Sequence, residues 1–137
     1  MKFKHLTIAM IISGFLNLPA NSQIQKTSSE DFPSFYNKFT TDSLFQISRI
    51  IFPLKGCTYY LNNELNEDSL PWIKEKWHFC VANIYKIDTA KYKTKILVQD
   101  SNITENIWKD NSGFMMERHF SLIKGKWYQD YFLVSNM

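Results

Sequence analysis

The chain has 137 residues, of which 45% are hydrophobic and 16% aromatic, and its formal net charge is +3. This length fits one ordinary domain with a buried core, so the composition excludes a disordered or collagen-like chain. The small net charge gives no reason to expect nucleic acid as a partner.

The first 22 residues have the pattern of a secretion signal. Lys2 and Lys4 give a positive start, an apolar run covers 6–18, and small residues follow at 19–22. This run would also fit a buried core helix, but it is shorter than the about 20 residues that cross a bilayer, and no later stretch is longer. No cysteine follows it for lipid attachment. We predict cleavage after Ser22, one domain over 23–137, no membrane span, and release into the periplasm or beyond.

The mature chain is expected to begin with two short helices. Aromatic residues at 32, 35, 36 and 39 repeat with the helical period, and Ser29 or Asp31 can cap that helix. Asp42 can cap a second helix over 43–48. The apolar run 50–53 predicts a strand, with 59–61 as its continuation, before a polar loop at 62–69. Ser69 and Pro71 predict the start of a third helix.

From residue 77 onward the apolar period approaches two, which is typical of strands. This period predicts strands at 77–87, 92–99, 113–123 and 127–134, whereas 101–111 shows no clear period. Lysines at 91, 93 and 95 alternate with other residues, which predicts a strand with one solvated face. Lys124 and Gly125 mark a tight turn, because glycine adopts positive φ easily. Helices first and strands later predict an α+β fold, with the helices on one face of an antiparallel sheet.

Residues 45–54 (FQISRIIFPL), with the aromatic helix before them and a Gly-Lys-Trp sequence at 125–127, resemble a family of exported bacterial proteins. That family has a nuclear transport factor 2-like fold, also called the cystatin-like roll. The resemblance covers nearly all of the mature chain. It implies a curved sheet wrapped around a long first helix, with a cone-shaped hollow between them. The superfamily includes isomerases, dehydratases, cyclases and binding domains, so its fold does not select a function.

The last hairpin supplies candidate catalytic residues. A two- or four-residue turn pairs His119 with Asp130 and Ser121 with Tyr128. A carboxylate opposite an imidazole raises its basicity, as the acid/base chemistry of a lyase or isomerase requires. A three-residue turn would instead pair His119 with Tyr131 and separate the two groups.

The opposite face of this hairpin is more apolar and is the expected core side, so the polar set would then point into water. That apolar face comprises Phe114, Met116, Phe120, Leu122, Trp127, Tyr131 and Leu133.

Four further residues are candidates for binding. Gln46 is a polar residue in an apolar segment, so it either finds buried hydrogen-bond partners or faces the hollow. Arg49 either belongs to a pocket, pairs locally, or reaches the last carbonyls of its helix. Trp77 and Trp127 either line a small-molecule site or fill the core.

The two cysteines, Cys57 and Cys80, would meet an oxidising compartment after export. They either form a disulfide or remain thiols, in which case Cys80 is a small buried apolar residue. We expect no metal site, because His78 is the only nitrogen ligand near them. We also expect no cofactor.

The sequence is therefore interpreted as a non-catalytic exported domain that binds a small molecule, a glycan fragment or an envelope protein. A lyase or isomerase with a His/Asp pair in the hollow is the second interpretation. The third is a protein–protein module that dimerises through the outer face of the sheet, which requires a closed hollow and an exposed apolar patch.

Overall fold

The computed structural model describes residues 28–60 and 71–136. Two helices come first, α1 (Phe32–Phe39) and α2 (Ser43–Ser48), and a 3₁₀ turn, η1 (Lys74–Lys76), comes later. The strands are β1 (Ile50–Lys55), β2 (Thr58–Tyr60), β3 (Lys93–Gln99), β4 (Asn102–Trp108), β5 (Phe114–Ile123) and β6 (Lys126–Asn136). The predicted signal peptide, Leu61 and the predicted polar loop at 62–69 lie outside the described residues.

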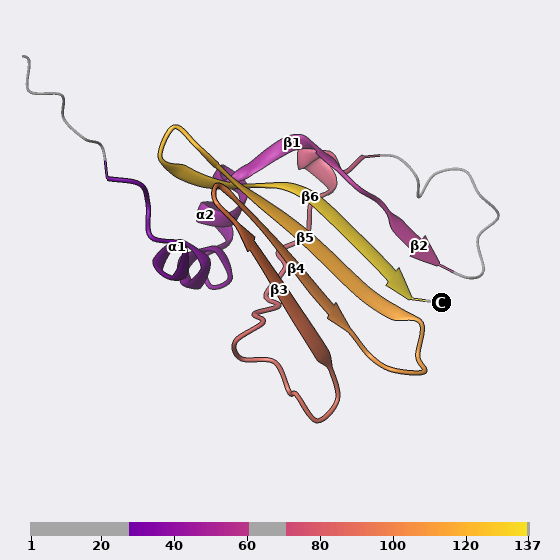
Figure 1. The fold of residues 1–137 in the computed structure, drawn as a ribbon. Coiled ribbons are helices and arrows are strands. Elements are labelled where there is room, and N and C mark those ends of the chain that lie inside the picture. The colour runs from indigo at the N-terminus through magenta and orange to yellow at the C-terminus, as the bar shows by residue number, and fades with distance from the viewer. Residues whose placement is uncertain (1–27, 61–70, 137) are drawn as a thin grey trace, which may run out of the picture.

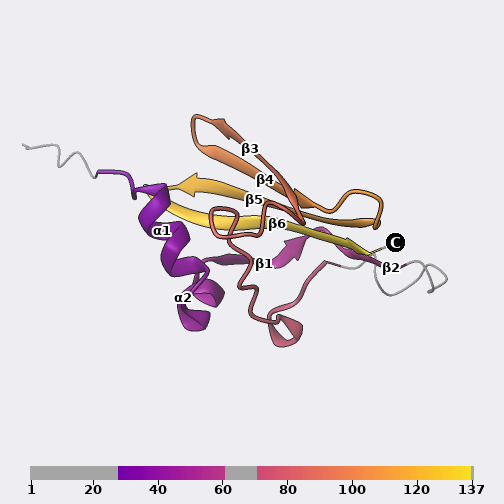
Figure 2. The ribbon, with the colours of Figure 1, turned by 90° about the horizontal axis from the view of Figure 1, so that it is seen from below.

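The strands form one curved sheet in the order β1-β6-β5-β4-β3, with β2 also paired to β6 (Figure 1). Strands β3 to β6 are antiparallel neighbours, as predicted. Strands β1 and β2 instead run parallel to β6, because they reach it from the helices and not through a hairpin. Both helices lie on one face of the sheet (Figure 2), so the predicted α+β architecture is confirmed.

The helices begin at the predicted aspartates. The carboxylate of Asp31 accepts a hydrogen bond from the Ser34 amide at 3.0 Å, and that of Asp42 accepts one from the Phe45 amide at 2.9 Å. Each bond satisfies an amide at the helix start that has no partner within the helix. Helix α1 has only eight residues, so the long first helix implied by the resemblance is replaced by two short ones.

Residues 77–87 were predicted to be a strand, and this prediction is wrong. They form an irregular segment, here called the strap, which lies on the helix-bearing side of the sheet (Figure 2). Cys80, Ala82 and Ile84 pack against the core, whereas Phe79 and Val81 are exposed. The period of two therefore arises from one-sided packing without strand pairing. The predicted third helix is reduced to η1.

Strand β4 occupies the stretch that showed no clear period. Its buried positions are Ile103, Glu105 and Ile107, so a charged residue stands where the strand pattern requires an apolar one. The charged residue Glu105 at a buried position therefore hid the apolar period of β4 in the sequence.

The β5–β6 hairpin has a two-residue turn, one of the lengths considered from the sequence, since Ile123 pairs with Lys126 and Ser121 with Tyr128. The register then shifts between Phe120, which pairs with Gln129, and His119, which pairs with Tyr131. Asp130 is thus the extra residue of a β-bulge, and a bulge reverses which later side chains face inward.

Because of this bulge, Phe132 is buried in the core in place of Tyr131 and Leu133, which were predicted there. The core lies between α1, the strap and the inner face of β4 to β6. Its aromatic rings include Phe35, Phe39 and Phe120, whose centroids lie 5.3–5.8 Å apart.

Gly56 makes a close approach that no other residue could make. Its φ is +104°, and a Cβ there would lie 1.9 Å from the carbonyl oxygen of Phe132. Among the described residues, no helix is long and apolar enough to cross a membrane.

Candidate functional site

A buried ion pair is the most unusual polar feature of the interior. Arg118 on β5 and Glu105 on β4 are direct cross-strand partners, and their side chains are 0% and 2% exposed. The Arg118 Nε donates a hydrogen bond to Glu105 Oε1 at 2.6 Å. Buried charges are tolerated only when they are paired and hydrogen-bonded, and this pair meets both conditions.

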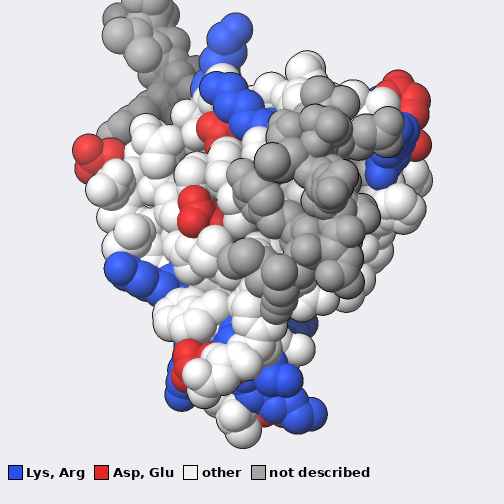
Figure 3. Space-filling model, turned by 90° about the vertical axis from the view of Figure 1, so that its right-hand side faces the viewer, with Lys and Arg blue, Asp and Glu red and all other residues white. Residues whose placement is uncertain are grey.

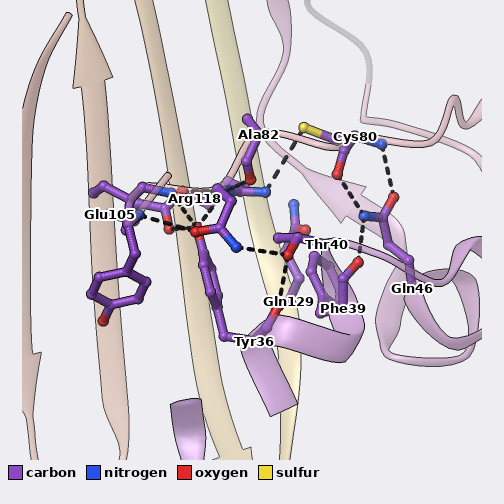
Figure 4. Close-up of polar contacts among 12 residues, drawn as sticks. Tyr36, Phe39, Thr40, Gln46, Cys80, Ala82, Glu105, Arg118 and Gln129 are labelled. Carbon is purple, nitrogen blue, oxygen red and sulfur yellow. Dashed lines mark hydrogen bonds and ion pairs between the residues drawn. The ribbon is translucent and has the colours of Figure 1, made fainter. Parts of the chain in front are cut away.

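Tyr36 of α1 completes this group, as Figure 4 shows. Its hydroxyl donates to Glu105 Oε2 and accepts from Arg118 Nη2 at 2.9 Å and from the Ile84 amide at 3.1 Å. The same Nη2 donates to the carbonyl oxygen of Ala82 at 2.7 Å. We call Tyr36, Glu105 and Arg118 the buried triad. It binds the backbone of the strap at two points.

Two members of the triad, the guanidinium and the phenol, keep their protons. Burial alone would lower the pKa of Arg118, but the charge of Glu105 and its hydrogen bond, together with the nearby Tyr36 and Cys80, outweigh burial and raise that pKa, so the guanidinium stays charged. Burial raises the pKa of Tyr36 far above its ordinary value, and its phenol stays neutral at physiological pH. The Glu105 carboxylate accepts hydrogen bonds from both of the other members, so the three side chains bind one another and hold the strap.

Gln46 of α2 holds the strap in a second place. It is fully buried, and its Nε2 donates to the carbonyl oxygens of Phe39 at 2.9 Å and Cys80 at 2.8 Å. Its Oε1 accepts from the Cys80 amide and from Trp77 Nε1, both at 3.0 Å. Of the two predicted environments, Gln46 has the buried one, with every hydrogen-bonding group satisfied. The structure therefore brings Trp77 and Gln46 together, and they hydrogen-bond to each other.

Arg49 and Trp127 are also brought together, by Glu30. Arg49 binds both carboxylate oxygens of Glu30 at 2.9 Å, and its Nη1 donates to the Trp127 carbonyl at 3.0 Å. The Trp127 amide donates to the Glu30 carboxylate at 2.8 Å. Burial would raise the pKa of Glu30, but these hydrogen bonds outweigh it and hold that pKa below its ordinary value of 4.5. Arg49 therefore pairs locally, with Glu30 and not with the end of its helix.

The predicted His119–Asp130 pair does not form, and the bulge is the reason. His119 stacks on Tyr131, with ring centroids 4.4 Å apart, and its Nε2 lies 2.6 Å from Glu117 Oε1. Asp130 instead accepts a hydrogen bond from Ser121 Oγ at 2.6 Å. Tyr128 contacts neither His119 nor Asp130 in a hydrogen bond, and its ring centroid lies 5.4 Å from the guanidinium carbon of Arg49.

His119, Glu117 and Tyr131 alternate with the buried residues Arg118, Phe120 and Phe132, so they belong to the outer face of the sheet. There, burial raises the pKa of the Tyr131 phenol, and the negative charge of Glu117 adds to the effect.

Both cysteines are free thiols, so the disulfide considered from the sequence is not present. Cys57 is buried, and its carbonyl accepts a bond from the Val134 amide at 3.0 Å. Cys80 lies in the strap, with its Sγ 3.8 Å from Arg118 Nη1. Within residues 28–60 and 71–136, no three His, Cys, Asp or Glu side chains are grouped as metal ligands.

The sequence did not single out the triad. Arg118 occupies the apolar face of its strand, between Met116 and Phe120, and that position was the available signal. The second signal was Glu105, which stands between Ile103 and Ile107 on the apolar face of β4. A charged residue on an apolar strand face requires a buried partner of opposite charge, and here two neighbouring strands each supply one.

Two short helices and a strap on one face of a curved sheet define a nuclear transport factor 2-like fold. The chain belongs to an uncharacterised family whose model, described only as "-like", matches residues 30–134. No curated protein matches it.

Solved structures from two Bacteroides species are similar to this chain. The NMR structure of a protein from Bacteroides uniformis ATCC 8492 has 25% sequence identity and a TM-score of 0.56, over 80% of this chain and 78% of that one. The crystal structure of an NTF2-like protein from Bacteroides fragilis NCTC 9343 has 20% identity and a TM-score of 0.54, over 80% of this chain. This alignment spans 48% of the B. fragilis protein, and at that identity it shows the fold alone.

Proposed function

We propose that this protein is an exported, non-catalytic domain that binds another protein of the cell envelope. One observation carries the proposal: the acid and base groups of the interior bind one another and the strap. Arg118 and Glu105 are fully paired, and the phenol of Tyr36 is neutral. An acid/base enzyme needs groups that converge on a substrate, and these converge on the protein's own backbone.

The distribution of apolar side chains supports a surface function. The strap exposes Phe79, Val81 and Tyr85, and β3 exposes Leu97 and Val98. Exposed apolar groups on the surface are what a protein–protein module requires. A small molecule or glycan fragment would have to displace the strap, which the triad and Gln46 hold by five hydrogen bonds to its backbone and to Trp77.

The proposed location depends on the signal predicted over residues 1–22. The intact mass of the protein recovered from the periplasm or medium tests it, with a chain beginning at residue 23 as the expected result. A recovered chain that still begins at Met1 would contradict export by cleavage.

The binding proposal is tested by NMR of the isotopically labelled protein. We expect a panel of sugars, steroids and aromatic acids to leave the side-chain N–H signals of Arg118 and Trp77 in place, because Arg118 is fully buried, Trp77 is partly buried, and both groups are hydrogen-bonded within the protein. Soluble envelope proteins of the host are expected to broaden backbone signals of surface residues. Small-molecule shifts at Arg118 or Trp77 would replace this proposal with an interior ligand site. Sedimentation of the protein alone separates partner binding from dimerisation through the outer face of the sheet.

A further inference from the structure

Strand β3 is the free edge of the sheet. It pairs with β4 on one side and ends the strand order β1-β6-β5-β4-β3 (Figure 1). Its residues are mostly exposed, whereas those of β4 alternate between buried and half-buried. A free edge presents backbone N–H and C=O groups that can hydrogen-bond to another strand.

The turn after β3 shows which of its residues have free backbone groups. Gln99 pairs with Asn102 across a two-residue loop, and such a loop closes on a hydrogen-bonded pair. The pattern alternates from there, so the odd-numbered residues of β3 bond to β4. Thr94, Ile96 and Val98 therefore direct N–H and C=O outward, and no hydrogen bond from another described residue reaches them.

The side chains of this edge have a definite chemical pattern. Lys93 and Lys95 are exposed on the outer face, and neither forms an ion pair with a described residue. Leu97 and Val98 follow directly and are 45% and 69% exposed. Figure 3 shows basic side chains, with acidic ones beside them, at the lower end of the molecule, where the loop that leads into β3 lies in Figure 1.

We propose that β3 binds an extended acidic segment of a partner protein by strand addition. Its free backbone row supplies affinity for any extended chain, and alternate side chains supply selectivity. Acidic residues of the partner lie opposite Lys93 and Lys95, and apolar residues lie opposite Ile96, Leu97 and Val98. This inference rests on the proposed binding function and names the surface and the chemistry of its partner.

Lysines on an edge strand also serve to prevent unwanted pairing. Lysines that only prevent pairing should oppose the addition of any strand, whereas lysines that recognise a partner should favour strands with acidic residues. The two roles therefore predict different binding results. Pairing of β3 with a second copy would bring four lysines to one short edge, which like-charge repulsion opposes.

The test uses the protein produced from its full-length coding sequence and an acetylated, amidated probe peptide, Thr-Val-Leu-Val-Glu-Thr-Glu. Run antiparallel to β3, this probe places its glutamates opposite Lys95 and Lys93. We expect NMR shifts concentrated on the amides of 93–99. A probe with lysine in place of both glutamates should bind at least about tenfold more weakly, since two attractive contacts become repulsive.

Two matched pairs of controls separate strand addition from general attraction. N-methylation of the fourth probe residue removes an N–H that faces β3 and should abolish binding, whereas N-methylation of the fifth, which faces away, should not. The double variant Lys93→Glu/Lys95→Glu should weaken binding about tenfold, whereas Lys74→Glu/Lys76→Glu, an exposed pair with the same spacing on η1, should leave it nearly unchanged.

Equal effects of the two lysine pairs, or of the two N-methylated probes, would overturn the proposal. So would absence of probe binding at millimolar concentration, although envelope proteins could then still broaden other surface signals and support the binding function. Concentration-dependent broadening of β3 signals without probe would assign the edge to a second copy instead.

Discussion

Removing the negative charge of the buried triad tests whether it holds the strap. Glu105→Gln keeps the shape of the side chain but leaves the guanidinium of Arg118 without its counter-ion. Arg118 is 0% exposed, so water cannot replace the lost carboxylate. Breaking a buried pair by removing one partner costs about 3–5 kcal/mol, which is a large part of the stability of a domain of this size.

Urea denaturation followed by tryptophan fluorescence measures this cost, provided that the slope of the unfolding free energy against urea is unchanged. Glu117→Gln is the matched control, because Glu117 lies on the neighbouring strand and contacts His119 on the outer face, with 28% of its side chain exposed. It should cost less than about 1 kcal/mol. Equal losses for the two variants would refute the structural role assigned to the triad.

Three further predictions concern backbone geometry and pH. Gly56→Ala should destabilise the fold well beyond the about 1–2 kcal/mol of positive φ alone. Gly125→Ala, at φ +78°, should cost no more than that, because a Cβ there would make only an ordinary contact with the Ser29 Cα at 3.9 Å. Urea midpoints compare the two variants. The fold lowers the pKa of Glu30, so the contribution of Glu30 to stability is present above about pH 4.5 and is lost as pH falls through the folded pKa. An acid titration of the Glu30→Gln variant should not show this loss of stability. The fold raises the pKa of Tyr36, so the contribution of Tyr36 to stability is complete below pH 10.0 and is lost as pH rises from there through the folded pKa. The Tyr36→Phe variant should therefore show a flatter alkaline denaturation profile by circular dichroism.

The local elements of this fold could be predicted from the sequence because short-range signals determine them. Asp31 and Asp42 cap their helices through amides only three residues away, and the two-residue turn at Lys124 follows from the flanking alternation. The bulge at Asp130 leaves no such signal, since alternation continues on either side of it with opposite phase. The position of the turn at Lys124 and Gly125 was therefore predicted, its length was left open, and the His119–Asp130 pairing considered for a two- or four-residue turn does not form.

Long-range partners account for the other differences. The strap alternates like a strand, but its hydrogen bonds come from side chains of α1, α2 and β5, and no local pattern encodes that choice. Glu105 hid the period of β4 because its partner, Arg118, lies on another strand. Each of these two charged residues interrupts the apolar face of its own strand, and each supplies the buried counter-ion that the other requires.

The strap also explains why a charged triad is retained in so small a core. An irregular segment packed against the interior brings backbone groups that no strand or helix satisfies, and an unpaired buried group costs about 1–3 kcal/mol. The Cys80 amide and carbonyl, the Ala82 carbonyl and the Ile84 amide are four such groups. Gln46, Arg118 and Tyr36 satisfy all four. Gln46, Arg118 and Tyr36 are thus accounted for by the strap backbone that they bind. Under our proposal, the surface, and β3 in particular, is the part of the protein that a partner contacts.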